Sequence, residues 1–353
     1  MDMKSVGIAD RGLDIPLIQG GMGVGISRCN LAGAVAAEGG MGVISAAQVG
    51  YDREEFARDP EGANLRELPR QIQRAKEIAG GRGMIGVNIM AVTQLYGEYV
   101  RKACEAGADA IITGAGLPMT LPQYAAGFSA KLAPIVSSGK AAQVILKYWD
   151  RKYSRTADFI VAEGPLAGGH LGFSFETLAQ LSAYDFGREV EAILAVKKQY
   201  EEKYGKAIPL FLAGGIMGAQ DVRRALSLGA DGVQVASRFV ATEECDAAPA
   251  YKQAYIQARE EDIAIIHSPV GMPGRALRNA FIRRMENGQE KITGCYNCLK
   301  ACDPATAPYC ITQALVNAVK GDIDNGLIFC GARVGEIDRI TRVKDVLAEL
   351  GLR

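Results

Sequence analysis

The sequence lacks a net charge and lacks any long apolar run. Its 353 residues carry 40 Lys and Arg against 40 Asp and Glu, so the formal net charge at pH 7 is zero. Because nucleic-acid-binding proteins carry a basic excess, no nucleic-acid partner is indicated. No apolar run approaches the roughly 18 residues that a membrane helix needs, and residues 1–5 lack the apolar core of a signal peptide. These absences predict a soluble, cytoplasmic protein with no membrane partner.

Histidine and tryptophan are scarce as well, with two His and one Trp in the whole chain. Disorder is excluded, because 48% of the residues are hydrophobic and only 23% are charged, a composition that can bury a large core. The length predicts two domains, or one large barrel with an appendage. The eight cysteines of a cytosolic chain are expected as free thiols or metal ligands rather than disulfides.

Short apolar runs recur along the first two thirds of the chain. Runs without polar alternation are typical of parallel strands buried on both faces. They cover residues 15–19, 42–45, 84–89, 110–113, 132–136, 159–162, 208–213 and 232–235. Helix-like segments lie between them, at 27–38, 68–79, 96–106, 175–204 and 219–228. Eight such units predict a (β/α)8 TIM barrel. An open, doubly wound sheet is the alternative, disfavoured by the strand count and by the lack of a nucleotide fingerprint in a strand-to-helix context.

The pattern changes after about residue 245. Helices are expected at 250–261, 275–286, 311–319 and 343–350, around a Pro- and Gly-rich loop at 267–274. We therefore predict two domains, a barrel over residues 1–245 and a helical capping extension over residues 246–353 with a Cys-rich segment.

Two loops of the predicted barrel carry groups suited to a phosphate. Active sites of such barrels lie at the carboxyl ends of the strands, and phosphate sites commonly use the loops after strands seven and eight. Gly214 and Gly215 follow the seventh run, and Ala236 and Ser237 follow the eighth. Their backbone N–H groups and the serine hydroxyl predict a phosphate site, although a Gly pair also occurs in ordinary tight turns.

His170 is the strongest candidate for catalysis. It lies in a Gly-rich loop after the sixth run, whereas His267 lies in a Pro- and Gly-rich loop and is expected to be structural. A histidine in such a loop can move a proton or hold an anionic oxygen. Glu163, just upstream, is expected either to pair with His170, to bind a ligand, or to be a surface charge.

Five motifs together resemble the nitronate monooxygenase family, which also contains the flavin-dependent enoyl-acyl-carrier-protein reductase II. They are QGGM (19–22), GVNIM (86–90), EGPLAGGHLG (163–172), AGGI (213–216) and GVQVASRF (232–239). The resemblance implies a barrel that binds FMN, with His170 as the catalytic residue. The cofactor-binding residues that it implies, together with the candidate Glu163, are Gly21, Met22, Asn88, Glu163, Gly168, Gly169, Gly214, Gly215, Gln234, Ala236 and Ser237.

The resemblance leaves the reaction open. Reductases of the family pass a hydride from NAD(P)H through FMN N5 to an activated C=C, and monooxygenases oxidise alkyl nitronates with O2. GVNIM (86–90) and the Arg275 to Asn279 segment are more similar to the reductases, so reduction is preferred. Arg275 and Arg278, one helical turn apart on the helix expected there, are placed to meet an anionic cofactor or substrate, or else to form a solvated helix face. A flavin-free phosphate-binding lyase or isomerase and a non-catalytic flavin carrier are further alternatives. The choice between NADH and NADPH stays open, as does a homodimer.

The Cys-rich segment has the spacing C-x2-C-x3-C-x7-C, formed by Cys295, Cys298, Cys302 and Cys310. Thiolates at such spacing can bind zinc or an iron–sulfur cluster. The first three would also share one face of a helix, where small thiols pack well. We prefer packing to a metal site here.

Overall fold

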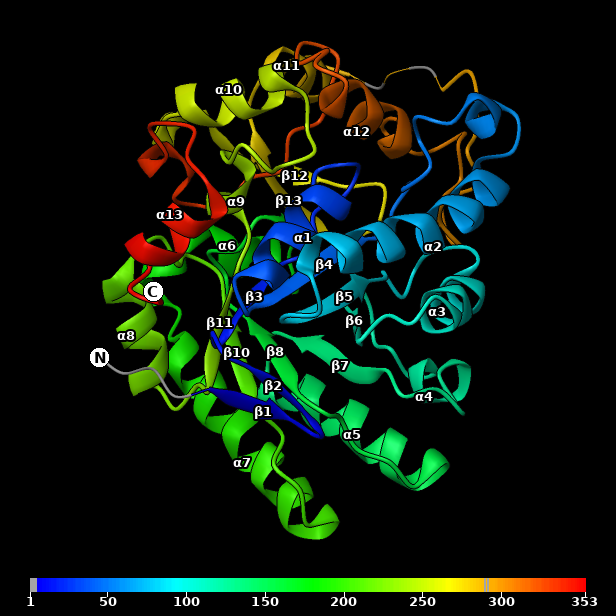
Figure 1. The fold of residues 1–353 in the computed structure, drawn as a ribbon. Helices are drawn as coiled ribbons and strands as arrows, with labels where there is room; N and C mark the ends of the chain where they lie inside the picture. Colours follow the sequence, from blue (N-terminus) through cyan, green and yellow to red (C-terminus); the bar gives the residue numbers. More distant parts are fainter. Residues whose placement is uncertain (1–4, 289, 291) are drawn as a thin grey trace.

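The computed structural model describes residues 5–288, 290 and 292–353. Within these residues, eight parallel strands close into a barrel in the order β3-β4-β5-β6-β7-β8-β10-β11, with β11 pairing back to β3 (Figure 1). Their bounds are β3 (Leu17–Gln19), β4 (Met41–Ser45), β5 (Met84–Asn88), β6 (Ala110–Thr113), β7 (Lys131–Val136), β8 (Ile160–Glu163), β10 (Leu210–Ala213) and β11 (Gly232–Val235). Each strand lies on a predicted apolar run. The barrel is thereby confirmed, and the open sheet is wrong.

Helices surround the barrel, and side-chain caps set several of their starts. Asp59 accepts from the N–H of Gly62 at the start of α2, and Ser138 accepts from the N–H of Ala141 at the start of α5. The bounds are α1 (Cys29–Ala37), α2 (Pro60–Ala79), α3 (Tyr96–Glu105), α4 (Leu121–Tyr124), α5 (Gly139–Tyr153), α6 (Phe175–Ala179), α7 (Phe186–Tyr204), α8 (Ala219–Ser227) and α9 (Ser237–Val240), with 3-10 turns η1 (Glu54–Ala57) and η2 (Leu181–Ala183).

The single helix expected over 175–204 is wrong. It is divided into α6, η2 and α7. Asp185 has an extended backbone, and its carboxylate accepts from the N–H of Gly187, so α7 begins anew at Phe186.

A hairpin that the sequence analysis missed closes the amino-terminal end of the barrel. It consists of β1 (Val6–Ile8) and β2 (Arg11–Leu13), paired antiparallel. Ile8 and Leu13 are fully buried and pack into the same apolar cluster as the barrel-interior residues Phe159 and Phe211. The hairpin lies at the bottom of Figure 1, opposite the extension.

The extension is not purely helical, which corrects the expectation for residues 246–353. It contains the helices α10 (Pro249–Gln257), α11 (Ala280–Glu286), α12 (Ile311–Val319) and α13 (Val343–Glu349), and the 3-10 turns η3 (Glu260–Asp262) and η4 (Val334–Glu336). It also contains β12 (Ile263–His267) and β13 (Pro273–Leu277), which form a sheet with β9 (Gly169–His170) from the barrel loop. Of the helix expected over 275–286, only residues 280–286 are helical, because residues 275–277 belong to β13, whose pairing with β12 and β9 overrides the local helical pattern.

The extension and the barrel share one hydrophobic core. Tyr251 on α10, Val316 on α12 and Leu347 on α13 are buried in the same cluster as Leu31 on α1. In Figure 1, α10 to α12 lie above the strands and α13 lies beside α8 and α9. The two-domain division at residue 245 stays a prediction.

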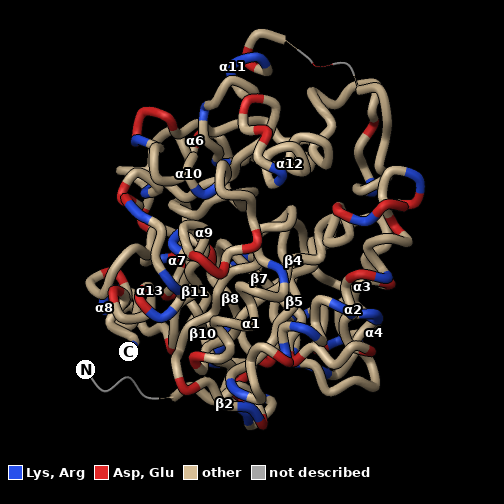
Figure 2. Tube along the Cα trace, turned by 45° about the horizontal axis from the view of Figure 1, so that its top comes forward, with Lys and Arg blue, Asp and Glu red and all other residues tan. Residues whose placement is uncertain are grey.

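Positively and negatively charged residues are not gathered on opposite sides of the molecule. Figure 2 shows Lys and Arg interspersed with Asp and Glu along the outer helices and loops. Among the described residues, no helix is long and apolar enough to cross a bilayer.

Candidate active site

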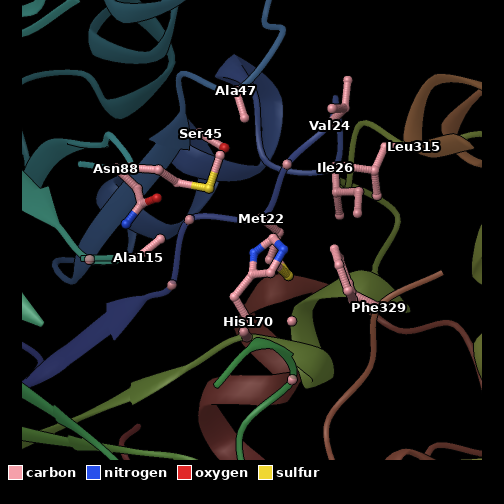
Figure 3. Close-up of a pocket in the computed structure, with 18 of the residues that line it drawn as sticks. Met22, Val24, Ile26, Ser45, Ala47, Asn88, Ala115, His170, Leu315 and Phe329 are labelled. Atoms are coloured by element: carbon pink, nitrogen blue, oxygen red, sulfur yellow. The ribbon is translucent and has the colours of Figure 1, made fainter. Parts of the chain in front are cut away.

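A large open cavity lies where the carboxyl ends of the barrel strands meet the extension. Every residue predicted for the site lines it: Gly21, Met22, Asn88, Glu163, Gly168, Gly169, His170, Gly214, Gly215, Gln234, Ala236 and Ser237. Figure 3 shows Asn88 and Ser45 on one side of His170, and Phe329 and Leu315 on the other. The barrel brings these residues together because its strands are parallel, so that all their carboxyl ends lie at the same rim.

The two loops expected to hold a phosphate lie on this cavity with free donors. Gly214 and Gly215 have left-handed backbones, with φ of +96° and +75°, a conformation that glycine adopts at little cost. Within the described part of the chain, their backbone N–H groups have no hydrogen-bond partner. The hydroxyl of Ser237 accepts from the N–H of Gly331 at 3.1 Å, which leaves its own proton available to an anion.

Close approach of the first loop explains its glycines. A Cβ added to Gly21 would stand 2.4 Å from the Cβ of Asn88, so a side chain there would displace a residue of the neighbouring wall. A Cβ on Gly20 would contact Gln234 at 3.3 Å. The N–H of Met22 donates to the hydroxyl of Ser27 at 2.8 Å, which anchors the loop.

The sixth loop is held by the extension. A Cβ on Gly168 would stand 2.5 Å from the carbonyl of Cys330, so only glycine fits. Gly169 and His170 form β9, in register with Arg275 and Gly274 of β13. The conformation of the catalytic candidate is thus set by residues about 100 positions away.

His170 is half-buried at the cavity wall and held by two side chains. Its Nε2 lies 2.8 Å from the hydroxyl of Ser268, and its ring meets the ring of Phe329 edge-on, with centroids 4.9 Å apart. Burial without a nearby carboxylate lowers the pKa of His170 to about 4. The imidazole is therefore neutral near pH 7, able to accept a proton or to donate a neutral N–H, but not to act as a cationic acid.

Glu163 has the opposite shift. It ends β8 at the cavity, and burial raises the pKa of its carboxyl to about 7. The expected pair with His170 is absent among the described contacts, since His170 bonds Ser268 instead. Opposite shifts of two titratable groups in one cavity are common at functional sites.

Arg275 and Arg278 are not one helical turn apart, which corrects both readings of that pair. Arg275 is buried on β13 and donates from Nη1 to the carbonyl oxygens of Pro165, at 2.8 Å, and Ala167. Arg278 lies beyond the strand and forms an ion pair with Glu286. Arg275 thus holds the loop that carries His170 in place. Neither arginine lies on a helix, so the expected helix face for a ligand is absent at these two residues.

Sequence reasoning missed three site residues that the extension supplies. Ser268 and Phe329 hold His170, and Arg333 lines the cavity while donating to the carbonyl of Gly215 at 2.7 Å and to Asp221 at 2.8 Å. No local signal marks them, because each meets its partner across about 100 residues or more. His267, expected to be structural, is exposed and lies against the ring of Phe175.

The Cys-rich segment forms no helix from Cys295 to Cys302, so the shared helix face expected for its thiols is wrong. All four cysteines are free. Among the described residues, no group of three or more His, Cys, Asp or Glu could hold a single metal ion.

Comparisons with known proteins agree on one family. A family model described as nitronate monooxygenase matches residues 8–352. A probable nitronate monooxygenase of Staphylococcus saprophyticus is 25% identical over 78% of this chain and 79% of its own length. A Mycobacterium tuberculosis protein, (3aS,4S,5R,7aS)-5-hydroxy-7a-methyl-1-oxo-octahydro-1H-indene-4-carboxyl-CoA dehydrogenase, is 26% identical over 78% of this chain and 67% of its own. The structure of FabK from Thermotoga maritima superposes with a TM-score of 0.70 at 25% identity, covering 96% of this chain and 92% of that one.

Proposed function

Because the chain belongs to the nitronate monooxygenase family and is an FMN-dependent oxidoreductase, we propose that it reduces an activated C=C with NAD(P)H as the electron donor. The substrate class is an α,β-unsaturated carbonyl compound with an apolar body. The main support for this proposal is that the neutral imidazole of His170 lies beside an apolar wall of the cavity.

The cavity fits FMN on two observations. Gly21 lines the cavity without a side chain, which leaves its backbone open to a planar ring. The free N–H groups of Gly214 and Gly215 and the hydroxyl of Ser237 offer donors to the phosphate. Met22, Asn88, Glu163, Gly168, Gly169, Gln234 and Ala236 would line the remainder of the cofactor site. FMN, when bound, supplies the two-electron redox chemistry that the side chains lack.

His170 would orient and polarise the substrate. As a neutral imidazole it can donate an N–H to a carbonyl oxygen without the desolvation penalty of a buried cation. The hydroxyl of Ser268 and the ring of Phe329 fix its position, so its orientation is set before a substrate enters. The ring can also pass a proton at the carbon next to the carbonyl.

The wall opposite Asn88 is apolar. Val24, Ile26, Leu315 and Phe329 line it (Figure 3), and Phe329 and Leu315 come from the extension. Such a wall suits an acyl chain or a ring system better than a small nitronate. One relative is named as a dehydrogenase of a carboxyl-CoA compound, which supports an acyl substrate.

Nitronate oxidation with O2 is the second candidate, favoured by the name of the Staphylococcus saprophyticus relative. A flavin-free lyase or isomerase does not fit this chain, since the family is FMN-dependent. A carrier without catalysis would leave the fixed, neutral His170 without a role.

An anaerobic titration separates the two candidates. NADH and then NADPH is added to the FMN-loaded protein while the flavin absorbance is followed. We expect stoichiometric bleaching by one nucleotide, reversed by an α,β-unsaturated carbonyl compound. Absence of bleaching by either nucleotide, with reduction by an alkyl nitronate, would reject the reductase and favour the monooxygenase.

A further inference from the structure

The four cysteines of the Cys-rich segment surround a second, small cavity beside the main one. Cys295, Cys298, Cys302 and Cys310 all line it, together with apolar residues such as Leu299 and Ile311. Irregular chain segments therefore meet at this small cavity, and each brings at least one cysteine to its wall.

A backbone amide already donates to one of these sulfurs. The N–H of Asn297, a residue with a left-handed φ of +50°, donates to the Sγ of Cys295 at 3.3 Å. Cys310 is the N-cap residue of α12, without a side-chain cap hydrogen bond, so its thiol lies near the backbone N–H groups that begin this helix. N–H donors to sulfur tune and stabilise metal-bound thiolates.

The segment is anchored from outside, so the thiols are held in place without a metal. Thr93 and Leu299 form an antiparallel bridge, and the N–H of Gln94 donates to the carbonyl of Cys298 at 3.2 Å. The ring of Tyr296 stacks on Phe56, with centroids 5.4 Å apart.

The spread of the thiols argues against a single ion. Four thiolates on one zinc ion, with bonds of about 2.3 Å, stand about 3.8 Å from one another. Among the described residues, no group of three or more His, Cys, Asp or Glu could hold a metal ion, yet the four thiols line a common cavity. In a [4Fe–4S] cluster each thiolate binds a different iron, so the sulfurs surround a larger body.

We propose that Cys295, Cys298, Cys302 and Cys310 ligate a [4Fe–4S] cluster. Cys298, Leu299 and Ile311 line both cavities, so the cluster stands behind one wall of the main cavity. From there it can exchange single electrons with a flavin. The ligation itself does not depend on which reaction the flavin site performs.

The test is the metal content of the full-length protein, purified without oxygen from cells grown with ample iron. We expect about four iron and four acid-labile sulfide per chain, a broad absorbance that remains after the flavin bands are bleached, and an EPR signal after dithionite reduction. Cys302→Ala and Cys298→Ala should lose at least half of the iron and sulfide. Cys104→Ala, a buried cysteine on α3, should keep both.

Flavin content and the thermal unfolding midpoint, measured on each variant, separate loss of the cluster from loss of the fold. Zinc in place of iron would overturn the proposal. So would less than one iron per chain after anaerobic reconstitution with ferrous iron and sulfide, or a disulfide among these cysteines. Bleaching by NAD(P)H is read on the flavin alone, so the reductase proposal and the cluster proposal fail independently.

Discussion

At the scale of single residues, burial shifts the pKa values of two groups in one cavity in opposite directions. Low-polarity surroundings disfavour the charged form of any group, so they lower the pKa of His170 to about 4 and raise the pKa of Glu163 to about 7. Neither group has a counter-ion among the described salt bridges. Both are therefore largely uncharged between about pH 5 and pH 6, which suits a cavity for an apolar substrate.

Replacing His170 tests its role in turnover. We expect His170→Gln to keep its FMN and to lower kcat by ~10²–10⁴-fold, the usual contribution of a proton-transferring or polarising side chain. His267→Gln is the matched control, since His267 is exposed and lies outside the cavity lining. Steady-state kinetics and flavin content give the answer, and equal kcat values for the two variants would contradict the assignment.

Glu163 predicts a dependence of stability on pH. Its pKa is raised in the folded state, so folding binds a proton that the unfolded chain releases above about pH 4.5. The stability that it contributes is complete below that pH and is lost as pH rises to about 7. At 1.36 kcal/mol per unit, the flavin-free protein should lose on the order of 3 kcal/mol of its free energy of unfolding from this group.

Urea unfolding at pH 5 and pH 8 measures this loss. Glu163→Gln, which cannot ionise, should remove most of it, and Glu191→Gln, on the exposed side of α7, should not. A wild-type difference that Glu163→Gln leaves unchanged would assign the pH dependence to other groups.

At the scale of elements, the extension supplies one wall of the active-site cavity. β13 pairs with β9 and so fixes Gly169 and His170, and the N–H of Leu171 continues this pairing by donating to the carbonyl of Pro273 at 2.8 Å. Arg275, on the same strand, reaches under the loop to two carbonyls. The cap therefore positions the catalytic loop as well as covering the cavity.

Arg275→Met should loosen that loop. Hydrogen bonds to charged groups contribute about 1.5–3 kcal/mol each, and Arg275 is almost completely buried. We expect a loss of at least ~2 kcal/mol in the free energy of unfolding, with FMN lost more readily on gel filtration. Arg278→Met, which breaks the exposed pair with Glu286, should cost far less, because solvent screens such a pair. Equal losses in the two variants would refute a special role for Arg275.

At the scale of the whole molecule, the β1–β2 hairpin closes one end of the barrel, and the extension covers the other end, where the active-site cavity lies. Ile8 and Leu13 close the amino-terminal end by completing the interior cluster around Phe159 and Phe211. Stability and chemistry are thus assigned to opposite ends, as in other barrels of this kind.

This separation is testable in the hairpin. Ile8→Ala should lower the free energy of unfolding by about 2–5 kcal/mol, the range for a buried large-to-small change, while the affinity for FMN stays within twofold. Val6→Ala, at a partly buried position of β1, should cost less. A large fall in FMN affinity for Ile8→Ala would show that the two ends are coupled.

Periodicity and composition were sufficient to predict the barrel. Buried parallel strands leave a continuous apolar run, and each of the eight runs carries a strand. Parallel strands also place all their carboxyl ends at one rim, so Asn88, His170 and Gly214 could be assigned to a common cavity without knowing any distance between them.

What the chain pattern did not reveal depends on contacts between distant residues. The strand over 273–277 exists because β12 and β9 pair with it, and His170 is held by Ser268 across 98 positions. The cysteines line a common cavity beside the bridge that joins Leu299 to Thr93, about 200 positions away. Local patterns report the backbone and its burial, whereas pKa shifts, anchoring partners and the geometry of the thiols arise only when separate segments pack together.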